Sequence, residues 1–293
     1  MPTVISPPQK LCTFNAKIST DRKDSYPSGL AIGTNILAVV DRHNAAIKMF
    51  DSSGNFLQTF SGHGKNSLQK PFDAVFLPNR RLVVTDPEAG AVKVFDCTGQ
   101  YITDLEGNIR HPRGITLDLQ RKEFIIVDGH LRKICVYDAE YCKLLRTILP
   151  ISNKETSRSR NILVDPYYID VTPSGNYAIS DAVSPHIKII SPGNDKTGDV
   201  QDENLVLAQT IGTGSRADET LRPGGICCDR FGQILIADTI NGRVHRALPN
   251  GRVVGTLALP CDGLSNPLTV GLDSNGHLLV AQAGGNISKF KYL

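Results

Sequence analysis

The stretch DRHNAAIKMF, residues 41–50, begins with four side chains whose types could do chemistry. Asp41 and His43 could bind a metal ion or act as an acid–base pair. A real site of either kind needs groups that converge on one point from several parts of the chain. The first question is therefore whether this stretch occurs only once.

The stretch recurs along the chain in modified form. Its copies are DPEAGAVKVF from Asp86, DGHLRKICVY from Asp128, DAVSPHIKII from Asp181, DTINGRVHRA from Asp238 and the shortened QAGGNISKF from Gln282. In the four full-length copies the aspartate is kept, whereas the place of His43 is taken by Glu88, His130, Val183 and Ile240. An aspartate here can accept hydrogen bonds from the backbone of the following turn. We therefore interpret the repeated aspartates as structural: Asp41, Asp86, Asp128, Asp181 and Asp238.

A second marker, a proline, precedes each copy and opens a short apolar run. The six prolines are Pro27, Pro71, Pro112, Pro166, Pro223 and Pro267. The unit repeats after roughly 40 to 50 residues, which is the length of a four-stranded propeller blade. Each unit has short, nearly continuous apolar segments separated by turn sequences, and no segment shows a sustained helical period. The sequence therefore predicts an all-β fold, a six-bladed β-propeller.

The last unit ends after its third strand, and the N-terminal segment is a candidate for the missing fourth. Apolar and polar residues alternate in LCTFNAKIS, residues 11–19, as in a β-strand. Such a strand would close the ring and remove exposed sheet edges. We predict one domain, 1–293, with blades at 27–60, 71–105, 112–149, 166–211, 223–257 and 267–293 plus 11–19.

Composition limits the classes of function. The 293 residues are 40% hydrophobic and 21% charged with a net charge of +3, so we expect no DNA partner. No apolar run is long enough to span a bilayer, and no secretory signal is evident, so we expect a cytoplasmic domain without membrane contact. The seven cysteines show no CxxC pair and no zinc spacing, so we expect neither metal nor cofactor.

The pattern P-x-G-[IV], then [IV]-x-D, then [IV]-x-[IV]-[FY] resembles the NHL repeat over nearly the whole chain. HPRGITL and the final ISKFKYL are similar to the NHL domains of TRIM-NHL ubiquitin ligases. The long fourth unit and LPNG in the fifth resemble the muscle-associated branch. The resemblance implies a C-terminal domain without the RING, B-box and coiled coil. It also implies a monomeric domain whose full-length protein oligomerises through that coiled coil, and a role in binding RNA or protein substrates.

In a propeller, the loops between blades and the turns after the marker aspartates share one face. The inter-blade loops 61–70, 106–113 and 150–165 are rich in basic residues, and aromatic residues flank the prolines. Basic side chains could hold the phosphates of a nucleic acid, and the neighbouring aromatic rings could stack on its nucleobases. The candidate partner- or RNA-binding residues are Tyr26, Arg42, His43, Lys70, Arg110, His111, Arg113, Arg160, Tyr168, Arg222 and Arg243. The alternative for Phe72 and for one of Tyr167 and Tyr168 is packing inside the blade.

Three functions remain open from the sequence. The first is a non-catalytic recognition domain of a TRIM-NHL-type ubiquitin ligase that binds cytosolic proteins as ubiquitination substrates, because acidic residues offset much of the basic sector. The second is a single-stranded RNA-binding propeller for post-transcriptional regulation. The third is a propeller enzyme, which we disfavour because no GxSxG, HExxH or P-loop motif appears. We therefore expect no catalytic residues in this chain.

Overall fold

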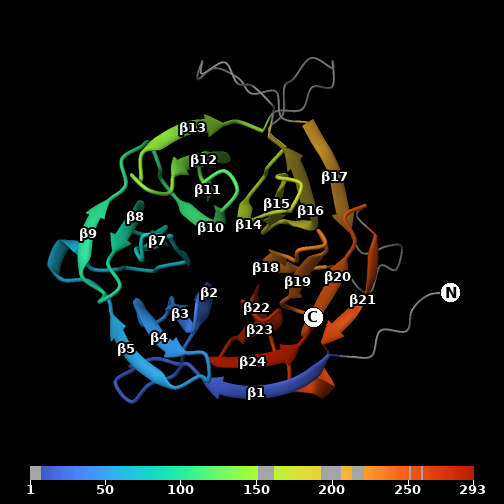
Figure 1. The fold of residues 1–293 in the computed structure, drawn as a ribbon, viewed down its shortest axis with the longest axis horizontal. Coiled ribbons are helices and arrows are strands. Elements are labelled where there is room, and N and C mark those ends of the chain that lie inside the picture. Colours follow the sequence, from blue (N-terminus) through green and yellow to red (C-terminus); the bar gives the residue numbers. More distant parts are fainter. Residues whose placement is uncertain (1–7, 151–161, 193–205, 213–220, 251, 259) are drawn as a thin grey trace.

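Six four-stranded antiparallel sheets are arranged around a central axis (Figure 1). The computed structural model describes residues 8–150, 162–192, 206–212, 221–250, 252–258 and 260–293. In these residues the only helical segments are the short 3-10 turns Gly64–Asn66 and Pro260–Asp262. The prediction of an all-β, six-bladed propeller is confirmed.

The blades follow one another along the chain, each with its first strand nearest the axis and its last at the rim (Figure 1). The strands of the first three blades are β2 (Pro27–Gly33), β3 (Ile36–Asp41), β4 (Ala46–Asp51), β5 (Phe56–Phe60), β6 (Asp73–Phe76), β7 (Leu82–Asp86), β8 (Ala91–Phe95), β9 (Tyr101–Asp104), β10 (Pro112–Asp118), β11 (Glu123–Asp128), β12 (Lys133–Asp138) and β13 (Leu144–Ile148).

The remaining blades have the same plan. Their strands are β14 (Pro166–Val171), β15 (Tyr177–Asp181), β16 (Ser184–Ser191), β17 (Val206–Gly212), β18 (Pro223–Cys228), β19 (Ile234–Asp238), β20 (Arg243–Ala247), β21 (Val253–Ala258), β22 (Pro267–Leu272), β23 (His277–Gln282), β24 (Asn286–Lys291) and β1 (Gln9–Asn15). Most of the inter-blade loop 150–165 lies outside the described residues, as do residues 193–205 of the fourth blade.

The N-terminal strand completes the last blade. β1 pairs antiparallel with β24, with Phe14 opposite Ile287, so the predicted closure of the ring is confirmed. The strand ends at Asn15 instead of residue 19. The difference arises because the Ala16 carbonyl accepts a hydrogen bond from the distant Lys48 and the amide of Ile18 donates to the Asp21 carboxylate. These bonds turn the chain away from the sheet.

The core lies between neighbouring blades. One cluster packs Ala38 and Ile47 of the first blade against Leu82 and Phe95 of the second. Strands β3, β7, β11, β15 and β19 are buried along almost their whole length. Because both faces of these strands are covered, their sequences are continuous apolar runs without alternation. Burial on both sides makes the ring a rigid support for its loops.

Candidate recognition surface

The repeated aspartates tie together two kinds of loop on one face of the ring. Asp128 accepts hydrogen bonds from the backbone amides of Arg110 and His111 in the loop before its blade. It also accepts them from His130 and Leu131 in the turn after β11, at 3.0 and 2.9 Å. We call this side the loop face. Since one buried carboxylate holds both segments, side chains on the loop face have defined positions.

The same arrangement occurs in the other blades. Asp41 accepts bonds from the amides of Tyr26, His43 and Asn44. Asp86 and Asp181 likewise accept bonds from amides in the preceding inter-blade loop and in the turn that follows. Asp238 accepts bonds from the amide of Arg222 and the side chain of Asn241. In the sixth blade Gln282 takes this place and accepts a bond from the amide of Ser265. These contacts account for the repeat of the aspartate.

Several of the candidate residues meet around the axis on the loop face. The guanidinium carbon of Arg42 lies 5.6 Å from the ring centre of Phe72, and that of Arg113 lies 5.3 Å from the ring centre of Tyr167. The two rings are 4.9 Å apart, edge to face. Two cations are thus held over adjacent rings. We define the axial cluster as Tyr26, Arg42, His43, Phe72, His111, Arg113 and Tyr167.

Arg113 is fixed by several partners. Its Nη1 donates to the Asp165 carboxylate at 2.7 Å and to the Pro166 carbonyl, and its Nε donates to Nδ1 of His111 at 3.1 Å. Burial and the neighbouring Arg113 charge lower the pKa of His111. Nδ1 is the acceptor in this bond, so the neutral imidazole carries its proton on Nε2. His111 can therefore donate one hydrogen bond to a ligand.

Arg42 differs from Arg113. Among the described residues, its guanidinium has no hydrogen-bond acceptor and no ion pair, and it lies over the Phe72 ring. The residue is half-buried. Next to it, the rings of Tyr26 and His43 lie 4.7 Å apart. A half-buried guanidinium without an acceptor is suited to binding a carboxylate or a phosphate.

The prediction that Tyr168 binds a partner is wrong, since this residue is only 4% exposed. Its hydroxyl donates to the Ser28 carbonyl at 2.5 Å, so the side chain reaches from the fourth blade to the first, across the axis. Tyr167, its neighbour in β14, is the tyrosine that contacts Arg113. Successive residues of a strand point in different directions, and only one of the two can enter the core. Phe72 is 1% exposed, in agreement with the alternative prediction that its side chain packs in the core.

The remaining candidates have other surroundings. Lys70 is exposed and forms an ion pair with Glu88 at 3.3 Å. Arg110 and Arg222 are exposed on their inter-blade loops, and Arg243 is half-buried at the start of β20. Arg160 lies outside the described residues. The axial cluster therefore contains Tyr26, Arg42, His43, His111 and Arg113 of the predicted set.

A cavity of about 130 Å³ lies on the axis, lined by the first strands of the blades. Asp73 accepts bonds from the amides of Ala74 and Ile115, and Asp170 accepts one from the Thr116 hydroxyl. Burial, with a smaller contribution from the Asp170 charge, raises the pKa of Asp73 to about 8. The carboxylates bridge neighbouring blades, and no group of three His, Cys, Asp or Glu residues suited to a metal occurs in the described chain.

Asp73 should make stability depend on pH. Its folded-state pKa lies above the ordinary value, so folding favours the protonated form, and this contribution is lost as pH rises from about 4 to about 8. Relative to Asp73→Asn, the parent should lose up to about 1.4 kcal/mol of unfolding free energy per pH unit in that range. Urea denaturation at several pH values measures this difference. Parallel stability curves for parent and variant would contradict it.

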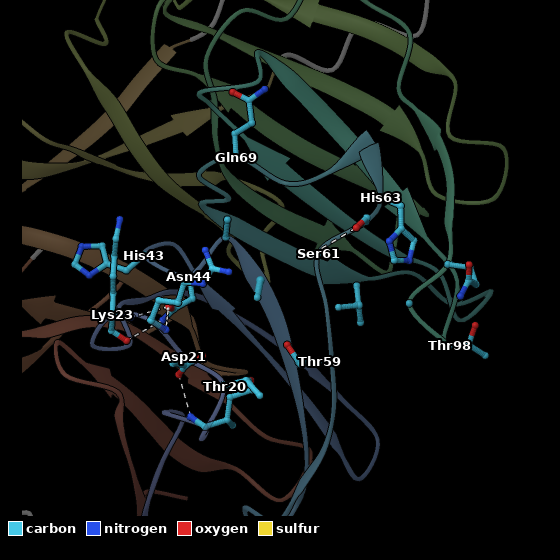
Figure 2. A pocket seen from close by; sticks show the side chains of 18 residues that line it. Thr20, Asp21, Lys23, His43, Asn44, Thr59, Ser61, His63, Gln69 and Thr98 are labelled. Atoms are coloured by element: carbon cyan, nitrogen blue, oxygen red, sulfur yellow. Dashed lines mark hydrogen bonds between the residues drawn. The ribbon is translucent and has the colours of Figure 1, made fainter. Parts of the chain in front are cut away.

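An open groove of about 760 Å³ runs from the loop face towards the rim. Figure 2 shows Lys23, His43 and Asn44 on one side of it and His63 and Thr98 on the other. The sequence did not single out this groove, because its lining comes from the N-terminal loop, the first blade, the inter-blade loop 61–70 and a turn of the second blade. Only His43 and the basic character of the loops pointed towards it.

Fold and surface together define the class of protein as a β-propeller built from six repeats, with a loop face that carries a fixed basic and aromatic cluster. No protein-family model matches the chain. The mouse protein named NHL-repeat-containing protein 4 is 28% identical over 133 residues, which are 45% of this chain and 85% of that protein. The chain thus has an NHL-repeat relative, in agreement with the repeat pattern.

Solved structures share the architecture. A virginiamycin B lyase from Staphylococcus aureus has a TM-score of 0.64 at 12% identity, covering 96% of this chain and 99% of that one. A Bacteroides thetaiotaomicron protein of unknown function has a TM-score of 0.65 at 17% identity, covering 97% and 73%. At such identities these matches show the fold alone. Among the described residues, no helix has the length and apolar character to cross a membrane.

Proposed function

We propose that this chain is a non-catalytic recognition domain that binds protein partners on its loop face, as the substrate-binding part of a TRIM-NHL-type ubiquitin ligase in the cytoplasm. The observation that carries the proposal is Arg42, a half-buried guanidinium held over Phe72 with no recorded acceptor among the described residues. A rigid ring that presents such a group on fixed loops is suited to recognition. The NHL-repeat relative and the repeat pattern support the assignment of class.

The described part of the other half of the loop face carries three exposed apolar side chains, which favours a protein partner. Val183 and Ile240 follow marker aspartates of the fourth and fifth blades and are 59% and 69% exposed, and Val164 in the preceding loop is 47% exposed. Apolar side chains next to a charged cluster are typical of surfaces that bind protein. A partner covering both halves would bury apolar area and pair with Arg42.

Single-stranded RNA is the second candidate, supported by the arginines and aromatic rings of the axial cluster. Two features argue against it. Phe72 is buried, and the Tyr167 ring is covered by Arg113 and by its contacts with Phe72 and Tyr168, so few ring faces remain for nucleobases. Lys70 and Arg113 are already paired with Glu88 and Asp165, which reduces the charge available for phosphates.

Capture of cytosolic proteins by the immobilised chain tests the proposal. Proteins retained by the parent should be lost from Arg42→Ala and kept by Arg230→Ala, which removes an exposed arginine from the turn between β18 and β19 on the opposite side. Ribonuclease treatment should not change the result. Retention that ribonuclease abolishes, or equal retention by Arg42→Ala and the parent, would contradict the proposal.

A further inference from the structure

The groove in Figure 2 is continuous with the axial cluster, because His43 lines it and the His43 ring lies 4.7 Å from that of Tyr26. From there it follows the end of β5 to the rim. At the rim the turn 98–100 closes tightly on β5, since a Cβ on Gly99 would lie 2.4 Å from a ring carbon of Phe60. The groove therefore has a fixed floor and a defined direction from the axis outwards.

The charge in this groove is one-sided. Arg22 and Lys23 line it and are exposed, and no acidic partner is recorded for either side chain among the described residues. The carboxylate in the lining, Asp21, is 4% exposed and accepts bonds from Lys48 and from the amide of Ile18. The Asp21 charge is thus already neutralised by Lys48, and Arg22 and Lys23 make the groove positively charged.

The cations lie on a segment with a fixed backbone. The side-chain oxygen of Asn44 accepts bonds from the amides of Arg22 and Lys23, and its nitrogen donates to the Lys23 carbonyl. Asn44 is itself bound to the marker Asp41 through Nδ2 at 3.0 Å. The loop that carries the cations is therefore attached to the turn that carries Arg42, so the positive groups keep a constant relative position.

We propose that this groove binds an extended acidic segment of a partner protein, with one carboxylate on Arg42 and further acidic groups along Arg22 and Lys23. The inference rests on the proposed function and specifies its ligand. The rest of the lining is rich in hydroxyl and amide side chains, which can pair with the backbone of an extended peptide: Thr20, Thr59, Ser61, Gln69 and Gln100. Phe60 is the only Phe, Tyr or Trp in the lining, and its ring packs against Gly99, so nucleobases could stack only on the imidazoles of His43 and His63.

Selection of binders from a displayed random-peptide library, using the whole chain as bait, tests this inference. Selected peptides should be enriched in aspartate and glutamate over the input library. Changing those acids to their amides should weaken binding of the synthetic peptides by about tenfold or more, as for lost charge-assisted hydrogen bonds. Arg22→Gln with Lys23→Gln should weaken binding similarly, whereas the control Arg230→Gln should not.

The outcomes separate the inference from the proposed function. Selected peptides without acidic enrichment that still require Arg42 or Ile240 would overturn the acidic-segment inference and leave the protein-binding function standing. No enrichment of any peptide, together with saturable binding of uridine-rich RNA that Arg22→Gln and Lys23→Gln abolish, would overturn both. Acid-dependent binding that survives loss of Arg22 and Lys23 would show that the segment binds elsewhere.

Discussion

Replacing Lys48 by methionine is expected to lower the free energy of unfolding by about 3–5 kcal/mol. The Lys48 side chain is completely buried, and its Nζ lies 2.6 Å from the Asp41 carboxylate, 2.5 Å from Asp21 and 2.9 Å from the Ala16 carbonyl. Methionine keeps most of the volume but leaves two buried carboxylates without their cation. An uncompensated buried charge is among the most destabilising changes a core can undergo.

The pH dependence of this effect has a definite sign. Burial raises the pKa of Asp41, but hydrogen bonds from Lys48 and Asn44 outweigh it and hold the pKa below the ordinary value. The contribution of this carboxylate is thus present at neutral pH and lost as pH falls below its ordinary range. The difference between parent and Lys48→Met should therefore shrink in acid, where the carboxylates become protonated.

Urea denaturation of parent and variant measures both effects. Lys17→Met is the matched control, because Lys17 also pairs with an aspartate, Asp24 at 2.7 Å, but both side chains are largely exposed. That variant should unfold like the parent. A Lys48→Met protein as stable as Lys17→Met would show that the buried ion pairs add nothing.

Removing residues 1–19 is expected to have the second large effect, opening the ring. The truncation deletes β1 and leaves the edge of β24 unpaired. It also removes Phe14, whose ring lies 5.2 Å from that of Phe50, and the fully buried Ala16. The carbonyl that binds Lys48 is lost as well. We expect a loss of several kcal/mol, enough to leave the chain partly unfolded.

Addition of the missing strand in trans separates loss of closure from general damage. A synthetic peptide of residues 8–20 should raise the melting temperature of the truncated protein in a concentration-dependent way. The same peptide with Phe14 changed to serine should be less effective. A truncated protein that melts at the temperature of the parent would show that β1 does not hold the ring.

The repeated unit could be predicted because its cause is local. Each marker aspartate binds loops close to it in sequence, so the pattern recurs in every blade. Closure was also predictable, since alternation in residues 11–19 is that of a strand, although the Lys48 contacts that end the strand early depend on residues distant in sequence. The residue type did not predict these contacts either, because a lysine in an apolar strand can also be exposed to solvent.

The site was less predictable than the fold, because it depends on which side chains reach the axis. Tyr167 and Tyr168 are adjacent and chemically identical, and only the register of β14 decides that Tyr168 crosses to Ser28 while Tyr167 meets Arg113. The groove of Figure 2 brings together segments that are far apart in the chain, from Ile18 to Gln100. The spacing of residues in the sequence does not show that such distant segments line the same groove.

The most direct test of protein recognition on the loop face is a titration of uridine-rich RNA against the whole chain at low and moderate salt. The account predicts at most weak binding that disappears at moderate salt and is the same for the parent and for the variant with Tyr26→Ala and Arg113→Ala. Micromolar or tighter binding that persists at moderate salt, weakens as salt is added and is abolished in that variant would contradict it, and would make RNA the ligand of the axial cluster.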